Sequence, residues 1–68
     1  MELSARNRMR GTVVSVTQGA VNATVKIDIG GGHVITSGIT NEAVTDLDLS
    51  DGDAVTVIIK STDVIIGK

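Results

Sequence analysis

Positively charged and hydroxyl-bearing residues gather near both ends of this 68-residue chain. Arg6, Arg8 and Arg10 lie within the first ten residues, and Lys60 is followed directly by Ser61. Cations beside hydroxyl and amide donors bind small anions, so Arg6 and Lys60 with neighbouring donors could form an anion site. The alternative, which composition alone favours, is that these are ordinary surface charges at the ends of strands.

Other residues with chemical potential have simpler explanations. Segment 41–53 contains no basic residue and holds five acidic ones: Glu42, Asp46, Asp48, Asp51 and Asp53. Its spacing lacks the EF-hand pattern and that pattern's final glutamate, so a solvated turn is the favoured interpretation. His33 comes directly after three glycines. No G-K-[ST] sequence follows these glycines, so they predict an exposed hairpin rather than a phosphate-binding loop.

The composition excludes several classes of function. The chain has no cysteine, which rules out disulfides, thiol catalysis and cysteine-ligated metals. It also has no Phe, Tyr or Trp and a net charge of −2, so it offers neither stacking surfaces nor a general attraction for nucleic acid. One histidine and no clear carboxylate pair give no catalytic constellation, so no enzyme activity is expected.

The hydropathy pattern predicts a small soluble protein that associates with itself. No run approaches 18 apolar residues and no apolar stretch marks a secretory signal, so we expect a cytoplasmic protein without a membrane partner. Aromatic side chains usually supply much of a small core, and here aliphatic residues must replace them. We therefore expect additional apolar surface to be buried between subunits of a homo-oligomer.

The elements that must position the charged residues are mainly strands. Ten valines, eight isoleucines and eight threonines make the chain strongly β-branched. Val21–Ile29 alternates apolar and polar residues without exception, which predicts a half-buried strand. Arg10–Thr17 predicts another strand, with Val14 and Val16 on one face, and Gln18–Ala20 joins the two at hairpin length.

The second half of the chain adds one helical turn and two strands. Gly30–Gly32 breaks the pattern, and Thr40 is a suitable N-cap for a helical turn. The predicted elements are strands at 10–17, 21–29 and 33–39, a helical turn at 40–47, a tight turn at 49–53, and strands at 54–60 and 62–66. This order predicts an all-β fold with one short helix, a five-stranded OB-like barrel with the helical turn between strands 3 and 4. An SH3-like barrel is the alternative.

Five segments together carry a resemblance to a known family. They are Ser4–Gly11 (SARNRMRG), Gly19–Ala23 (GAVNA), Ile39-Thr40, Leu47-Asp48-Leu49 with Gly52-Asp53, and Ile59–Ile65 (IKSTDVI). On these segments the chain resembles the molbindins, the small molybdate- and tungstate-binding proteins of the Mop family. The resemblance spans residues 3–66, and the S-A-R-N start combined with the I-K-[AS] end is its most specific part.

The resemblance implies an OB-like fold, a homohexamer built as a trimer of dimers, and oxyanion sites at subunit interfaces. Carried over by position, the main site comprises Ser4, Ala5, Arg6, Thr40, Ala43, Lys60 and Ser61. Molybdate and tungstate present only acceptor oxygens, so guanidinium, ammonium, hydroxyl and backbone N–H donors suffice. Backbone N–H groups would come from Ala5 near the N-terminus and from Ala43, which lies at the start of the helical turn. No side chain ligates the metal directly, and no organic cofactor is implied.

Two positions in this transfer have alternatives. The family often has a serine where this chain has Ala43, so one hydroxyl donor is lost while the amide remains. A second class of site lies at the three-fold axes of molbindins, and its best match here is the backbone of Gly19, Ala20, Val21 and Asn22. An ordinary hairpin turn is an equally good interpretation of that loop.

The expected function is binding of molybdate or tungstate for intracellular storage or homeostasis, with residues 1–68 forming a single molybdate-binding (Mop) domain. In the alternative, the same anion is a signal, and the domain controls assembly with a separate partner protein. A nucleic-acid-binding OB domain is a third hypothesis, which the acidic net charge and the absence of aromatic residues disfavour.

Overall fold

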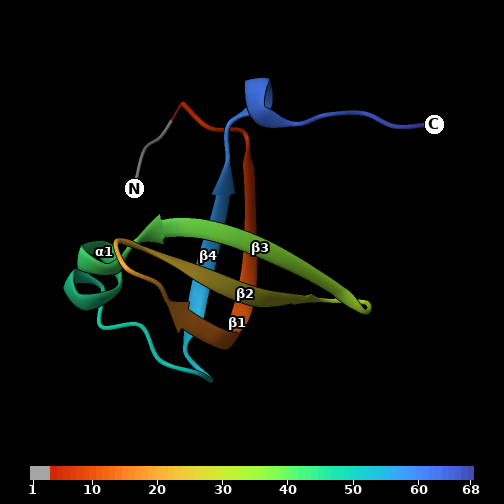
Figure 1. Cartoon of the computed structure of the whole chain (residues 1–68). Coiled ribbons are helices and arrows are strands. Elements are labelled where there is room, and N and C mark those ends of the chain that lie inside the picture. The colour runs from red at the N-terminus through yellow and green to blue at the C-terminus, as the bar shows by residue number, and fades with distance from the viewer. Residues whose placement is uncertain (1–3) are drawn as a thin grey trace.

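A computed structural model describes residues 4–68 of the chain as one antiparallel sheet with one short helix (Figure 1). The strand order in the sheet is β3-β2-β1-β4. In chain order the elements are β1 (Asn7–Gln18), β2 (Asn22–Gly30), β3 (His33–Thr40), α1 (Asn41–Asp46), β4 (Ala54–Ile59) and a 3-10 turn (Ser61–Asp63). The prediction of a mainly β fold with a helical turn between the third and fourth strands is therefore confirmed.

β1 is long because it pairs with two other strands, β4 and β2. Its first half pairs with β4, from Asn7 opposite Ile59 to Thr12 opposite Ala54. Its second half pairs with β2, and a β-bulge between Val13 and Ser15 shifts the register there. Such a bulge bends a strand and interrupts its alternation.

The bulge overturns one prediction about side-chain direction. Val14 and Val16 were expected on one face, but Val14 is 51% exposed while Val13 is 2% exposed. The extra residue at the bulge breaks the period of two, so Val13 and Val16 both contact the core and Val14 does not. Hydropathy cannot reveal this shift, because three of the four residues from 13 to 16 are valines.

The core lies on the concave side of the sheet and is closed at one end by α1. Its fully buried members are Val13, Ala23, Val25, Ile27 and Val44. Three of these alternate along β2, as its sequence predicts, and Val44 comes from α1. Half-buried aliphatic residues from β3, β4 and the loop after α1 surround them.

The turns follow the chemistry of their residues. Thr40 caps α1, since its Oγ1 accepts a hydrogen bond of 3.0 Å from the N–H of Ala43. The loop after α1 returns to β1, where the N–H of Val13 donates to Asp53 O and Val13 O accepts from the N–H of Gly52. The glycines at 30–32 all have positive φ, and His33 is exposed at the start of β3. The predicted glycine hairpin is thus confirmed.

The predicted fifth strand, 62–66, is wrong for the single chain. After β4 the chain makes the 3-10 turn, and residues 64–68 then run away from the sheet without regular structure (Figure 1). A strand needs a neighbouring strand for its backbone hydrogen bonds, and this segment pairs with no strand among residues 4–68. The barrel consequently has four strands and is open between β3 and β4.

Candidate functional site

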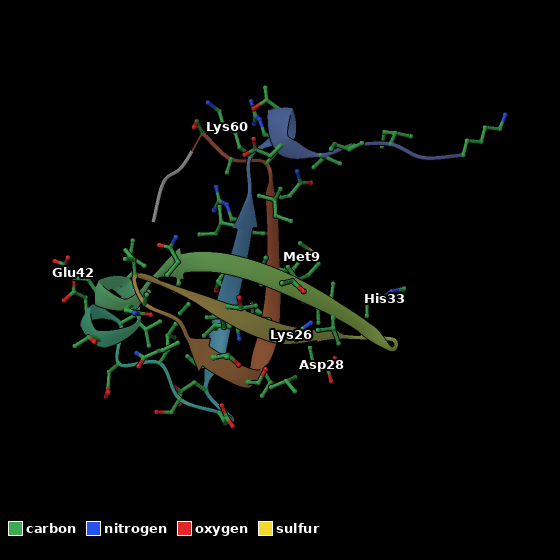
Figure 2. The ribbon with its side chains drawn as sticks, viewed as in Figure 1. Met9, Lys26, Asp28, His33, Glu42 and Lys60 are labelled. Atoms are coloured by element: carbon green, nitrogen blue, oxygen red, sulfur yellow. The ribbon has the colours of Figure 1, made fainter. Side chains whose placement is uncertain are left out.

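The pairing of β1 with β4 brings the two ends of the chain together. Asn7 and Ile59 form the last pair of this ladder, and Asn7 Nδ2 also donates to Ile59 O at 3.1 Å. Arg6 directly precedes Asn7 and Lys60 directly follows Ile59, so the two cations leave the same end of the sheet. Both side chains are exposed, and Figure 2 shows Lys60 beyond the end of β4.

The remaining terminal residues of the predicted site lie beside this pair. Ser4 is exposed and Ala5 half-buried in the segment that leads into β1. Ser61 begins the 3-10 turn, which is closed by a hydrogen bond from the Asp63 N–H to Lys60 O at 2.8 Å. We call this group, with Arg6 and Lys60, the terminal cluster. It offers a guanidinium, an ammonium and two hydroxyls.

Thr40 and Ala43 lie at the junction of β3 and α1, and we call them the cap pair. The N–H of Ala43, expected to be available to an anion, already donates to Thr40 Oγ1. The hydrogen of the Thr40 hydroxyl is not used in this bond and can still be donated. α1 spans only six residues, so its dipole adds little to the attraction for an anion.

The structure does not bring the terminal cluster and the cap pair together within one chain. The terminal cluster lies at the end of the β1–β4 ladder, whereas the cap pair lies where β3 meets α1, at a different corner of the molecule (Figure 1). The apolar pocket of the described chain, between β3 and β4, is lined by residues of neither group. A site made of all seven residues therefore needs more than one copy of the chain.

The loop predicted as a second site is tied to the start of α1. Within the loop, the Gly19 N–H donates to Asn22 O at 2.8 Å, so this amide is already used. Asn41 holds the loop from outside, because its Nδ2 donates to Gly19 O at 2.9 Å and its N–H donates to Val21 O at 2.9 Å. Ala20, Val21 and Asn22 are exposed.

Asn41 is the residue that sequence reasoning missed. Its Oδ1 is buried and has no hydrogen-bond partner among the described residues, although its Nδ2 and N–H both bond to the loop. Because Asn41 directly follows Thr40, these hydrogen bonds hold the loop 19–22 against the start of α1. An asparagine directly after a predicted N-cap was the only sequence signal, and it is weak because asparagine is common near helix starts.

Opposite ends of β4 carry opposite charges. Lys60 follows the strand, and Arg6 lies beside it, whereas Asp51 and Asp53 precede it. Six residues at about 3.3 Å each separate these ends by about 20 Å. Within residues 4–68 no group of three or more His, Asp or Glu side chains is placed to hold a metal ion, and no helix is long and apolar enough to cross a membrane.

The family of the chain follows from its match to a domain model. The model of the TOBE domain matches residues 3–66, nearly the whole chain. The chain therefore belongs to the TOBE domain family, and within it to the molbindins that its sequence resembles.

Similar proteins support this assignment along the full length. A probable molybdenum-pterin-binding protein of Haemophilus influenzae is 49% identical over 67 residues, covering 98% of this chain and 97% of that protein. The structure of a molybdate-binding protein from Sporomusa ovata superposes with a TM-score of 0.94 at 37% identity, covering both chains completely. A molybdate-bound form of the cytoplasmic protein ModG superposes with a TM-score of 0.91 at 46% identity, covering 96% of this chain and 46% of that one.

Proposed function

We propose that this protein binds molybdate or tungstate at interfaces between its own subunits and serves as an intracellular store or buffer of these anions. The observation that supports the proposal is the terminal cluster: Asn7 pairs with Ile59, so Arg6 and Lys60 leave the same end of the β1–β4 ladder. A tetrahedral dianion needs about two positive charges and several donors, and the cluster offers both.

The cap pair of a neighbouring subunit would complete the site. Thr40 would donate its free hydroxyl hydrogen to the anion, while its oxygen continues to cap α1. The Ala43 N–H would have to share or leave its bond to Thr40 in order to contact the same anion. We assign the main site to Ser4, Ala5, Arg6, Thr40, Ala43, Lys60 and Ser61 on this basis.

The loop 19–22 is proposed as a second, weaker oxyanion site. Three of its residues, Ala20, Val21 and Asn22, are exposed. Because the Gly19 amide is used within the turn, donors would come from the other backbone N–H groups. Convergence of several copies of the loop at a symmetry axis would supply enough donors for one dianion.

We propose a homohexamer, a trimer of dimers, as the assembly that forms these sites, with residues 1–68 acting as a single Mop domain. The cytoplasm is the compartment that fits such a store. The homologue ModG is described as a cytoplasmic molybdate-binding protein. A catalytic role is not part of the proposal, since the relatives are described by what they bind.

Native mass spectrometry across a molybdate titration tests the proposal, because it reports subunit number and bound anions together. We expect a hexamer that takes up molybdate or tungstate but not the smaller sulfate. Arg6→Ala should weaken binding at least tenfold, whereas Arg10→Ala, the same change at an exposed arginine on β1, should not. Equal affinity of both variants would refute the assignment of the main site.

The second candidate function is an anion-responsive module that acts through another protein. It is favoured only if the bound anion changes what the assembly recognises. Affinity capture with the immobilised protein, with and without molybdate, distinguishes the two. A partner retained only in the presence of the anion supports the module, and identical captures support storage.

A further inference from the structure

The loop 19–22 lies against the start of α1 (Figure 1), and the first residue of that helix binds two of its carbonyl oxygens. The Nδ2 of Asn41 donates to Gly19 O at 2.9 Å, and the N–H of Asn41 donates to Val21 O at 2.9 Å. A single residue thus determines the direction of two carbonyls in the loop, and both point towards α1.

The direction of a carbonyl determines that of the N–H group in the same peptide unit. A trans peptide unit is planar, so its C=O and N–H bonds point in opposite directions. Because Gly19 O faces Asn41, the N–H of Ala20 faces away from α1. Ala20 is exposed, and within residues 4–68 its N–H has no backbone acceptor. The loop therefore presents an outward-facing donor whose direction depends on Asn41.

This direction would have weaker support without the Asn41 side chain. Gly19 has no Cβ, so the peptide unit between Gly19 and Ala20 can tilt at small cost. A tilt that turns Gly19 O outward turns the N–H of Ala20 inward. A carbonyl oxygen would then face an anion that offers only acceptor oxygens, and the two would repel each other.

The side-chain amide of Asn41 can serve the loop in one orientation only. Its Oδ1 is buried and has no hydrogen-bond partner among the described residues. Exchanging the two ends of the amide would bring Oδ1 against Gly19 O, which places two acceptors together without a hydrogen between them. A buried acceptor without a partner costs free energy, and an apolar side chain that only filled this space would avoid that cost. The hydrogen bond to Gly19 O is what the asparagine adds.

We propose that Asn41 is the positioning residue of the second oxyanion site and holds the loop 19–22 with its free N–H groups towards a bound dianion. The inference rests on the proposed function, because that site is part of it. Asn41 does not contact the anion and acts through the peptide unit of Gly19. The main site does not depend on the Asn41 side chain, since the bond between Thr40 and Ala43 is made without it.

Titration of the isotope-labelled protein with sodium molybdate, followed by NMR, tests the proposal because each amide signal reports its own site. The Ala20 signal reports the loop, and the Ser61 signal reports the terminal cluster. Asn41→Ala should raise the dissociation constant read at Ala20 about fivefold or more, the effect of one lost hydrogen bond, while the constant read at Ser61 changes less than about twofold. A general loss of structure would weaken both.

Two further variants separate positioning from stability. Thr45→Val is the matched control, because it removes the bond from Thr45 Oγ1 to Asn41 O at 3.2 Å and keeps the Asn41 amide. It should lower the melting temperature without changing the constant read at Ala20. Asn41→Leu keeps a side chain of similar size and removes the buried Oδ1. It should be at least as stable as Asn41→Ala and bind the anion as weakly at the loop.

The possible outcomes distinguish this inference from the proposed function. An unchanged constant at Ala20 in both Asn41 variants, or an equal loss in Thr45→Val, would overturn the role of Asn41 and leave the proposed function intact. A natural protein whose Ser61 signal responds to molybdate while its Ala20 signal does not would overturn the second site together with this inference, but not the main site. No response at either signal would overturn the proposed function and the inference with it.

Discussion

An alanine at position 11 is expected to destabilise the protein, because β1 lies too close to β2 there for any side chain. A Cβ on Gly11 would overlap Cγ2 of Ile27 and would lie 2.8 Å from the backbone oxygen of Asp28. Asp28 is paired with Thr12 in the ladder, so its carbonyl cannot retreat without weakening the sheet. Ile27 is 4% exposed, so its side chain would have to shift within the core.

Overpacking of this kind costs about 1–3 kcal/mol. For a domain of this size each kcal/mol lowers the melting temperature by about 4–8 °C, so Gly11→Ala should lower it by about 4–24 °C. Gly38→Ala is the matched control. It makes the same change in β3, but nothing lies within 4 Å of the new methyl group. Because glycine weakens a strand interior by about 0.5–1 kcal/mol relative to alanine, this control should be neutral or stabilising.

Thermal unfolding by far-UV circular dichroism is the suitable assay, since the chain has no aromatic fluorophore. All variants must be compared at one protein concentration, because association contributes to stability. A Gly11→Ala protein as stable as the natural one would show that the strands can separate there at no cost. Equal losses in both variants would show that the close approach at Gly11 is not the cause.

Three further perturbations follow from single hydrogen bonds or backbone angles. Thr40→Ala removes the cap of α1 and should lower the free energy of unfolding by about 0.5–2 kcal/mol in urea denaturation, whereas Thr40→Ser should retain most of it. Asp48 has a φ of 51°, a backbone conformation that glycine adopts more easily than aspartate. Asp48→Gly should therefore raise the free energy of unfolding by at most about 1 kcal/mol, which a higher melting temperature would show. Asn41→Ala removes the bond to Gly19 O and should lower stability by about 1 kcal/mol, with faster amide exchange in the loop 19–22; unchanged exchange would show that Asn41 does not hold the loop.

The sequence was sufficient for elements whose side chains alternate and whose ends carry capping residues. β2 alternates without interruption, and its three buried residues lie on the face that the pattern predicts, although Val21, predicted as the first residue of that face, lies outside the strand and is 70% exposed. Thr40 was recognised as an N-cap from residue type alone, and α1 begins directly after it. Such features depend on neighbours in the chain, which a sequence displays directly.

Features that depend on distant or separate partners were not predictable in the same way. The bulge in β1 shifts the register within a run of valines. Hydropathy there does not indicate which valine faces the core, because neighbouring residues are equally apolar. The segment 62–66 has the composition of a strand, but no strand among residues 4–68 lies beside it. Arg6 and Lys60 reach the same end of the sheet through the pairing of Asn7 with Ile59, residues more than 50 positions apart. Charge placement offered a joint anion site only beside ordinary surface charge, and the family resemblance was needed to favour it.

The separation of charge along β4 gives the molecule an electric dipole that its net charge of −2 conceals. At the proposed site, an approaching dianion would be repelled by the end with Asp51 and Asp53 and attracted to the end with Arg6 and Lys60. Capture of the anion there would be guided by the field before any hydrogen bond forms. A protein that is acidic as a whole can in this way collect a negatively charged cargo, and it does so fastest in dilute salt.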